Sequence, residues 1–434
     1  MVTTSPSRLT PSMHPPQLTV SNWRRSRCPA WAHKLPRPSL TPRVVWLLSL
    51  CHSRPSRPLK AIRSRNVPTD FEILVIGAGQ AGLSAGYHLQ RLGLRPEHEF
   101  LIVDHAQAPG GAWQFRWPSL TLSTVNRVHD LPGMSFADTL PPGSETVPAA
   151  TAVPHYYELY EKRFELRVRR PVSVTVVCDR DADGNRCDGR GEFLNAETDS
   201  AGTMRVRGII NCTGTWEHPF IPVYPGAETF HGRQLHTHDY RTAAEFAGKH
   251  VVVVGGGISA VQLLDEISQV TTTTWVTRTE PRFRDDMFTA EAGRAAVAIV
   301  EDRVRRGLPP GSVVSVTGLR LDDRLRAAQK RGALQRLPMF KSIEPDGVRW
   351  ADGTFQHADV ILWATGFRSA LDHLAPLRLR GPGGGIKMDG RLATQVADDP
   401  RIHLIGYGPS ASTIGANRAG RAAAVELTSY LGLQ

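Results

Sequence analysis

The sequence predicts an α/β fold that contains two Rossmann-like units. Two stretches, FEILVIGAGQAGLSAGYHL at residues 71–89 and HVVVVGGGISAVQLL at residues 250–264, each combine an apolar strand, a glycine-rich turn and an apolar helix. This order of elements is typical of a turn that holds the pyrophosphate of a dinucleotide. A second strand follows each stretch and ends in a charged residue, Asp104 in the first unit and Arg278 in the second. The chain is therefore expected to bind two dinucleotides.

The excess of positive over negative charge lies in the first 68 residues of the chain. Residues 1–68 contain 12 of the 52 Lys and Arg and none of the 41 Asp and Glu. The remaining chain is close to neutral, so the net charge of +11 does not predict a nucleic-acid partner. Residues 1–68 are expected to be a disordered basic tail, or to result from a mis-assigned start, with the true protein beginning near Val67. Their Arg- and Ser-rich composition also resembles a transit peptide.

The sequence indicates neither a membrane span nor a metal site. Its apolar run VVWLLSLC at residues 44–51 is too short to cross a bilayer. The five cysteines include no CxxC pair and no metal-ligand spacing, which fits a reducing, cytoplasmic setting. Cys178 and Cys187 either pair across a hairpin or remain thiols.

The first glycine-rich turn has the pattern GxGxxG, formed by Gly77, Gly79 and Gly82. The first glycine permits a tight turn, the second lets the backbone approach a pyrophosphate, and the third lets the helix pack on the strand. We expect a helix over about residues 80–91, with its N-terminus toward the phosphate. The next strand, FLIVDHA, brings Asp104 to the position where an acid binds ribose hydroxyls.

The second turn has the variant pattern GxGxxA, formed by Gly255, Gly257 and Ala260, with Ser259 as a further cofactor contact. The strand TTTTWVTR that follows ends at Arg278 rather than at an acid. Because a guanidinium suits a 2′-phosphate, NADPH is favoured over NADH. Arg282 and Arg284 either assist Arg278 or form a solvated basic turn.

The segment after the first unit points to a known family. PGGAW at residues 109–113, continued by QFRWPSLTLSTVN, resembles the flavin-containing monooxygenase family and its Baeyer–Villiger relatives, in which GGxW follows the FAD fingerprint. The resemblance covers about residues 70–434. It implies that the first site holds FAD, with Gly111, Ala112 and Trp113 beside the isoalloxazine. It also matches Asn126 to a flavin-facing Asn of the family; the alternative is a turn-forming Asn.

The resemblance also implies how the two units are connected. IINCTGTWEHPFIP, which contains Thr213 and Gly214, is similar to the turn at which the chain leaves the FAD domain. ADVILWATGFRSAL, which contains Thr365 and Gly366, is similar to the return crossing. The implied fold has two Rossmann-like dinucleotide-binding domains, with the NADP domain (219–368) inserted in the FAD domain (70–218 plus 369–434). A later strand ends at Gly406, and a helix over about 416–427 is expected to direct its N-terminus toward the flavin.

FHGRQLHTHDYR at residues 230–241 fits the family motif FxGxxxHxxxY. The Baeyer–Villiger version ends in Trp, whereas Tyr240 stands here, which favours the members that oxidise heteroatoms. His236 and Tyr240 are thus candidate catalytic residues. Because the motif lies in the interdomain linker of the family, His236 is expected to couple domain positions; the alternative is a proton-transfer base.

Two other segments are less informative. Residues 285–345 contain the helical patterns TAEAGRAAVAIVEDRVRRG and RLRAAQKRGALQR, which either shape a substrate site or form solvated helices. Residues 178–208 contain DADGNRCDGRGE and are expected to form a turn-rich β-meander.

The resemblance implies a flavoprotein monooxygenase whose cofactors are FAD and NADPH. NADPH reduces FAD, which forms a C4a-hydroperoxide with oxygen and oxygenates N or S of a small molecule. Baeyer–Villiger oxygenation remains an alternative, as do electron transfer to a quinone or protein and a regulatory flavin-binding role. A dithiol acceptor within the chain is excluded, because GGAW stands where the disulfide reductases carry a cysteine motif and the NADP domain has no CxxC. The partners are molecular oxygen and a small-molecule substrate; the oligomeric state is not predicted.

Overall fold

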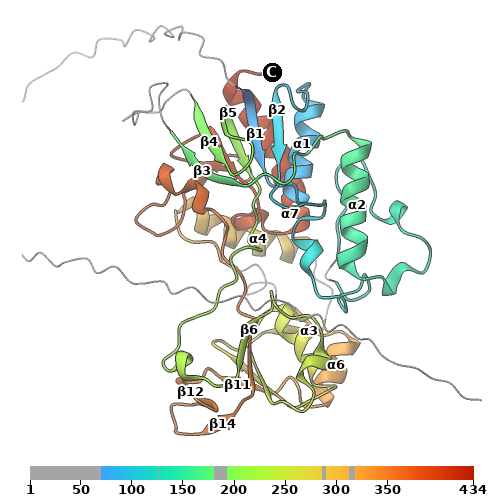
Figure 1. Cartoon of the computed structure of the whole chain (residues 1–434), viewed down its shortest axis with the longest axis vertical. Helices are drawn as coiled ribbons and strands as arrows, with labels where there is room; N and C mark the ends of the chain where they lie inside the picture. Colours follow the sequence, from blue (N-terminus) through green and yellow to red (C-terminus); the bar gives the residue numbers. More distant parts are fainter. Residues whose placement is uncertain (1–69, 126, 180–192, 286–289, 312–317) are drawn as a thin grey trace, which may run out of the picture. The chain divides into compact units, whose positions relative to one another are not determined.

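The computed structural model describes residues 70–125, 127–179, 193–285, 290–311 and 318–434. Residues 1–68, Asn126 and Cys187 lie outside the described residues, and so do the expectations placed on them. The described chain has a mixed α/β fold with two large sheets, each built around parallel strands, and two smaller ones (Figure 1). No helix in these five segments is long and apolar enough to cross a membrane.

The first sheet has the strand order β16-β17-β18-β5-β1-β2. Strands β2, β1, β5 and β18 run parallel, so the glycine-rich turn after β1 lies between the ends of β2 and β5. The antiparallel strands β3 and β4 extend from β5, as expected for a meander. The bounds are β1 Phe71–Ile76, β2 Phe100–Val103, β3 Val174–Cys178, β4 Leu194–Thr198, β5 Thr203–Asn211, β16 Met388–Asp389, β17 Gln395–Val396 and β18 Ile402–Leu404.

Three long helices accompany the first sheet. Helix α1 covers Gln80–Arg91, the predicted span, and packs against α7, Thr413–Leu431. Helix α7 is longer at both ends than expected, because Ser412 caps its N-terminus and Gly432 ends it in a left-handed conformation. Helix α2, Ala149–Arg163, was not predicted.

The second sheet has the strand order β11-β8-β7-β15-β6, with all neighbouring strands parallel. Helix α3 connects β7 to β8 and contacts α6. The bounds are β6 Arg233–His236, β7 Val251–Val254, α3 Ile258–Ile267, β8 Thr273–Thr277, α6 Asp323–Lys330, β11 Arg336–Pro338 and β15 Val360–Trp363. A separate antiparallel sheet comprises β12 Ser342–Glu344, β13 Gly347–Arg349 and β14 Phe355–His357.

The remaining elements are short. Strands β9 (Phe283–Arg284) and β10 (Leu319–Arg320) pair with each other in parallel. The 3-10 helices are η1 Gly111–Phe115, η2 Ala137–Thr139, η3 Ser144–Thr146, η4 Ala227–Thr229, η5 Ala243–Phe246, η6 Asp372–Leu377 and η7 Gly408–Ser410.

Helix α4, Ala290–Arg305, forms one of the two expected helical patterns and packs against the first sheet. It contacts η7 and β16, and Val304 belongs to the buried cluster under that sheet. Its other face carries the exposed Ile299. Thus one face of α4 packs in the core and the other is solvated.

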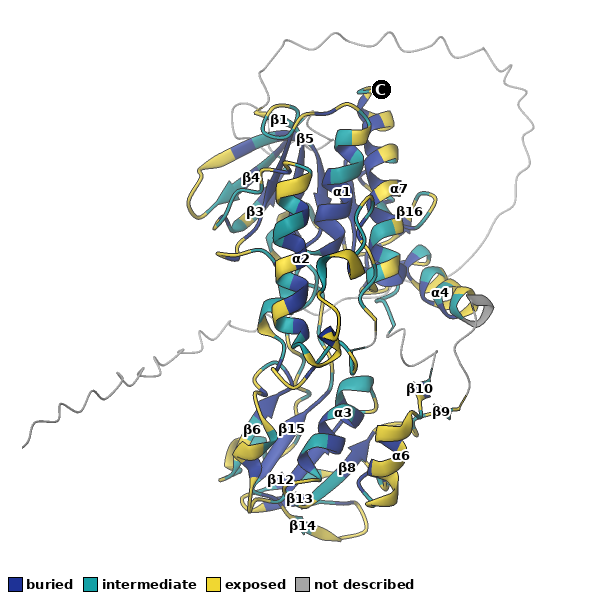
Figure 2. Ribbon diagram, turned by 90° about the vertical axis from the view of Figure 1, so that its right-hand side faces the viewer, coloured by how far each residue is buried: buried dark blue, intermediate teal, exposed yellow. Residues whose placement is uncertain are grey.

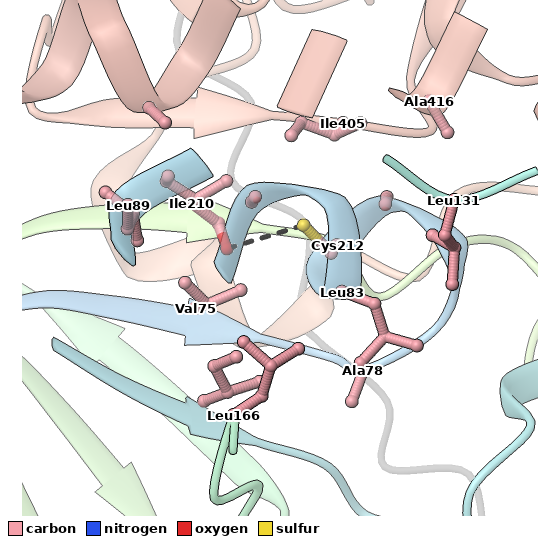
Figure 3. Packing of buried hydrophobic residues seen from close by; sticks show 14 of the residues in the cluster. Val75, Ala78, Leu83, Leu89, Leu131, Leu166, Ile210, Cys212, Ile405 and Ala416 are labelled. Atoms are coloured by element: carbon pink, nitrogen blue, oxygen red, sulfur yellow. Dashed lines mark hydrogen bonds between the residues drawn. The ribbon is translucent and has the colours of Figure 1, made fainter. Parts of the chain in front are cut away.

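The strands that lead into the glycine-rich turns are almost completely buried, as the dark blue of both sheets shows (Figure 2). This explains their continuous apolar sequence, because helices or other layers cover both faces of a parallel sheet. In the first core, Leu83 and Val75 pack near Cys212 and Ile405 (Figure 3). Complete burial of a Leu or Ile side chain contributes roughly 1.5–3 kcal/mol, which holds the turn after β1 in place.

Candidate functional site

The first turn has room for glycine alone at two of its three glycine positions. A β-carbon at Gly77, where φ is +97°, would lie 2.6 Å from the carbonyl oxygen of Cys212. A β-carbon at Gly82 would lie 1.8 Å from the carbonyl oxygen of Gly77. At Gly79, by contrast, a β-carbon would meet no protein atom within 4 Å. The backbone before α1 therefore faces open space, which fits a pyrophosphate at the helix N-terminus.

That open space is part of a cavity of about 580 Å³ beyond the carboxyl ends of the first sheet's parallel strands. Its size is within the range of small-molecule and cofactor sites. The predicted residues that line it are Gly77, Gly79, Asp104, Gly111, Ala112, Trp113, Thr213, Gly214 and Gly406. These residues come from five separate parts of the chain, and the fold brings them together.

Asp104 joins two of these parts. One carboxylate oxygen accepts a hydrogen bond from the Ala78 backbone N–H at 2.6 Å, and the other accepts from the Ala106 N–H at 2.8 Å. The residue is only 5% exposed, yet it lines the cavity. Each carboxylate oxygen can accept more than one hydrogen bond, so Asp104 retains the capacity to bind a ribose hydroxyl.

The Gly-Gly pair lies close to the first turn. Gly110 and Gly111 both have positive φ, +127° and +50°, and a β-carbon on Gly111 would lie 3.1 Å from the Cα of Gly79. Behind them, a β-carbon on Gly110 would lie 2.7 Å from the Pro154 side chain of α2. The unpredicted helix α2 therefore supports this backbone, which leaves a side-chain-free surface suited to a flat ring system.

The far end of the cavity is formed by the start of α7. Ser412, Thr413 and Ala416 line the cavity, and the Ser412 hydroxyl accepts a hydrogen bond from the Gly415 N–H at 3.1 Å. The N-terminus of this 19-residue helix therefore borders the cavity, as expected from the sequence. Its positive dipole end favours negative charge on a bound group.

Several lining residues were not singled out from the sequence, because their place in the cavity depends on the fold. His373 of η6 donates through Nε2 to the Asn211 side-chain oxygen at 2.7 Å. Burial lowers the pKa of His373 to about 4, so its ring is neutral at pH 7. Arg116, Trp216 and Phe367 also line the cavity.

The second turn repeats the geometry of the first but lies outside this cavity. A β-carbon on Gly255, where φ is +142°, would lie 2.2 Å from the Ala364 carbonyl oxygen. A β-carbon on Gly257 would meet nothing within 4 Å, and Ala260 is fully buried. Ser259 is half-buried at the start of α3. The second turn therefore also leaves open space beside its middle glycine.

The end of β8 is basic. Arg278 follows this strand and is exposed, as are the two residues after it. Arg336, at the start of the neighbouring strand β11, donates to the Thr277 hydroxyl at 2.9 Å and to the Thr277 carbonyl at 3.1 Å. Arg336 was missed in the sequence because its place beside β8 depends on strand pairing.

The two crossings between the sheets lie side by side. The Thr213 hydroxyl donates to the Ala370 carbonyl at 2.6 Å, and the Thr365 hydroxyl donates to the Phe220 carbonyl. The Phe220 N–H donates in turn to the Gly366 carbonyl at 2.9 Å. Each Thr-Gly turn is thus hydrogen-bonded to the segment of the other crossing, which positions one crossing against the other.

His236 lies at this junction and is 1% exposed. Its Nε2 is 2.9 Å from the Gly366 carbonyl oxygen and must donate, whereas Nδ1 accepts from the His238 backbone N–H at 3.1 Å. Burial also lowers the pKa of His236. The ring is therefore a neutral bridge with both nitrogens engaged, and it does not line the cavity.

Tyr240 lies in the core of the second sheet, away from the cavity. It is 1% exposed, and its hydroxyl donates to Glu266 of α3 at 2.9 Å. Ser119, from the segment after the Gly-Gly pair, donates to the same carboxylate oxygen at 2.7 Å. Glu266 therefore links Tyr240 to the segment that contains Ser119.

Comparison with known proteins agrees with this geometry. The family model described as pyridine nucleotide-disulphide oxidoreductase matches residues 74–291. The solved structure of a flavin-containing monooxygenase from Stenotrophomonas maltophilia is 35% identical with a TM-score of 0.68, over 83% of this chain and 98% of that chain.

Two more distant proteins are also similar. The rice indole-3-pyruvate monooxygenase YUCCA1 (Oryza sativa subsp. japonica) is 26% identical, over 68% of this chain and 76% of the relative. A cyclohexanone monooxygenase structure, 18% identical with a TM-score of 0.57 over 83% of this chain and 88% of that chain, shares the fold. The chain belongs to the flavin-containing monooxygenase family, related to the Baeyer–Villiger monooxygenases, and is a flavoprotein oxidoreductase with FAD and NADPH as cofactors.

Proposed function

We propose that this enzyme uses NADPH and oxygen to oxygenate the nitrogen or sulfur atom of a small molecule. For a sulfide, the balanced reaction converts sulfide, O₂, NADPH and H⁺ into sulfoxide, NADP⁺ and water. Bound FAD would accept hydride from NADPH and deliver the electrons to oxygen. The observation that carries the proposal is the pair of glycine-rich turns, each with open space beside its middle glycine, at Gly79 and Gly257.

FAD fits the first turn and its cavity. The N–H groups at the start of α1 would bind the pyrophosphate, and Asp104 would bind the ribose. The side-chain-free surface at Gly111 and Ala112, with Trp113 beside it, suits the isoalloxazine. The N-terminus of α7 would then favour negative charge on the reduced ring.

NADPH fits the second turn. The start of α3, with Ser259, would bind the pyrophosphate, and Arg278 would bind the 2′-phosphate. Arg278 is exposed, so its guanidinium is accessible to a phosphate. We propose domain limits of 70–218 plus 369–434 for FAD and 219–368 for NADP, because the paired Thr-Gly turns support crossings at these places. Helix α4 lies within 219–368 in the sequence but packs against the first sheet.

The residues of this chain would position the reactants rather than exchange protons. His236 has both ring nitrogens engaged by backbone groups, which supports a role in positioning the two crossings. Among the described residues, Cys212 is the only cysteine that lines the cavity, so no cysteine pair lies there. This argues against electron delivery to an internal disulfide.

Baeyer–Villiger oxygenation is the second candidate, because the cyclohexanone monooxygenase shares the fold. The presence of Tyr240 in place of Trp does not decide between the two, since its side chain packs in the core of the second sheet. The choice therefore depends on products. Incubation with an aryl methyl sulfide, a tertiary amine and a cyclic ketone should give the sulfoxide or the N-oxide; a lactone as the sole product would favour the alternative.

The first test is stopped-flow absorbance. The purified holoenzyme is reduced anaerobically with NADPH and then mixed with oxygenated buffer. We expect rapid flavin reduction, followed by a long-lived absorbance that differs from both the oxidised and the reduced flavin. Immediate return to oxidised flavin with stoichiometric hydrogen peroxide, and no product from any substrate, would contradict the monooxygenase proposal. Rapid oxidation by a quinone or protein acceptor would then indicate an electron-transfer reductase.

A further inference from the structure

Arg116 lines the cavity and has an unusual environment. It follows η1, and its guanidinium carbon lies 4.6 Å from the ring centroid of Trp216 and 5.8 Å from that of Trp113. Both distances are within the range of cation–π interactions. The two indole rings therefore hold a positive charge at the cavity wall.

This charge has no protein counter-ion among the residues that the structure describes. No carboxylate lies within ion-pair distance of Arg116, and no described oxygen accepts a hydrogen bond from its guanidinium. Burial lowers the pKa of Arg116 to about 10, which still leaves it charged at pH 7. Arg116 is half-buried, and a partly desolvated cation without a counter-ion is unfavourable, so a ligand with negative charge would gain from meeting it.

Other well-buried arginines of this chain are paired. Arg170 contacts Glu161 through two hydrogen bonds of 2.7 Å each. Arg401 contacts Asp399 through hydrogen bonds of 2.9 and 2.6 Å. In both cases the two oxygens of one carboxylate accept hydrogen bonds from two guanidinium nitrogens, a bidentate arrangement that is among the strong ones. Arg116 has no such carboxylate partner among the described residues, and its side chain lines the cavity.

Two further aromatic side chains pack on Trp216, one of the indoles that hold the cation. Phe115 stacks on Trp216 with ring centroids 6.2 Å apart, and Phe367 stacks on the same indole at 5.2 Å. Phe115, Trp216 and Phe367 all line the cavity. An aromatic wall with one fixed positive charge recognises a flat apolar molecule that carries an anion.

A dinucleotide phosphate is the other possible source of that anion. The expected place of the FAD pyrophosphate is beside Gly79, where the N-terminus of α1 offers its N–H groups. The 2′-phosphate of NADPH is expected at Arg278. Both phosphates thus have binding groups of their own, so the anion at Arg116 is better explained by the substrate.

We propose that Arg116 binds the carboxylate of the substrate, and that this enzyme oxygenates aromatic carboxylic acids that carry a sulfide or an amine. The proposal rests on the proposed function and specifies its substrate class. The face of the guanidinium would stack on the indoles, and its N–H groups would donate hydrogen bonds to the carboxylate. A neutral analogue would leave the cation unpaired and bind more weakly.

The test uses two probes with the same ring and sulfide, 4-(methylthio)benzoate and its neutral amide, 4-(methylthio)benzamide. The holoenzyme should show a kcat/KM for the acid about 10- to 100-fold above that for the amide, the range of a charged hydrogen bond. In Arg116→Gln this preference should vanish through loss of acid turnover, and Arg116→Lys should keep part of it. Binding affinity, measured by the quenching of tryptophan fluorescence, should be higher for the acid than for the amide in the wild type. This difference should be smaller in Arg116→Lys and absent in Arg116→Gln.

Arg368→Gln is the matched control. Arg368 lies 4.1 Å from the ring centroid of Phe220 but does not line the cavity, so its loss should leave the preference unchanged. Flavin content and the rate of NADPH-driven flavin reduction are measured for every variant. They should stay unchanged in Arg116→Gln, and circular dichroism checks its folding.

The outcomes separate the possible failures. Normal flavin reduction with equal binding and turnover of acid and amide by the wild type would overturn the acid proposal and leave the proposed function intact. Loss of FAD, or a raised KM for NADPH in both Arg116 variants without a change in the acid preference, would assign the cation to a cofactor phosphate. Absence of NADPH-driven reduction in the wild type would contradict the proposed function itself, and the fluorescence titration would still test the binding of the acid.

Discussion

Gly77 lies directly against the backbone of Cys212, so that a β-carbon at position 77 would approach the Cys212 carbonyl oxygen to 2.6 Å. Gly255 and Ala364 have the same relationship in the second sheet, at 2.2 Å. In both sheets the glycine that ends one strand touches the residue that follows the neighbouring parallel strand. The middle glycine of each turn, in contrast, faces open space. The first and middle glycines therefore serve different purposes, folding and ligand approach.

This difference predicts opposite results for two alanine substitutions in the first turn. Gly77→Ala should reduce the free energy of unfolding by about 2 kcal/mol or more, because it combines a positive φ with a backbone clash. Gly79→Ala should fold normally, since Gly79 has φ of −79° and an empty surrounding, but bind FAD at least about tenfold more weakly. Circular dichroism and FAD titration of the apoprotein measure both effects. Normal FAD affinity in Gly79→Ala would contradict the placement of the pyrophosphate.

The second turn gives a parallel prediction for the nicotinamide cofactor. Gly257→Ala should retain folding and FAD content, because φ of −95° suits alanine and the new methyl group meets no protein atom within 4 Å. The methyl group would nevertheless occupy the approach of the pyrophosphate, so the dissociation constant for NADP⁺ should rise about tenfold or more. Isothermal titration of the holoenzyme checks this result. A loss of FAD with unchanged NADP⁺ affinity would mean that the two turns are assigned the wrong way round.

Arg278 should determine the preference between NADPH and NADH. In Arg278→Gln, kcat/KM for NADPH is expected to fall roughly 10- to 100-fold, because a charged hydrogen bond to the 2′-phosphate is lost. In Arg278→Gln, kcat/KM for NADH should not change. In Arg278→Lys, kcat/KM for NADPH should fall less than in Arg278→Gln. Steady-state kinetics with both coenzymes measure the ratio. An equal loss for both coenzymes would rule out contact with the 2′-phosphate.

His236 should act as a positioning residue. His236→Gln keeps an N–H that can reach the Gly366 carbonyl, whereas His236→Ala removes both hydrogen bonds. In the alanine variant, the rate of flavin reduction by NADPH should therefore fall about tenfold or more. In the glutamine variant, this rate should fall less. The pH profile of the reduction rate should keep its shape in both. If His236 were instead a proton-transfer base, one limb of that profile would disappear.

His403 should contribute to sensitivity toward acid. It is fully buried in β18, and burial lowers its pKa to about 3, whereas an unfolded His has a pKa near 6.5. Between pH 6.5 and 3 the unfolded chain binds the extra proton, so stability falls as the pH falls through this window, by up to about 1.4 kcal/mol per pH unit. His403→Phe should reduce the loss of stability between pH 6.5 and 5. Urea unfolding at the two pH values tests this, and an unchanged difference would contradict it.

The sequence by itself determined the local parts of this protein. The strand, turn and helix of each glycine-rich unit are contiguous, and their apolar pattern and glycines are local properties. For that reason α1 was predicted with its correct bounds and Asp104 was predicted at the end of its strand. Cofactor-contact residues of this type follow from short-range geometry alone.

The tertiary structure decided what distant segments do to each other. It placed α2 behind Gly110, and packed Trp117, which precedes every strand of the second sheet in the sequence, into the core of that sheet. It also brought Arg116 beside Trp216, which is 100 positions away. Such contacts depend on side-chain packing between elements that are remote along the chain, and no periodicity or motif records them. The cofactor turns were therefore readable from the sequence, whereas the aromatic and charged wall of the cavity required the fold.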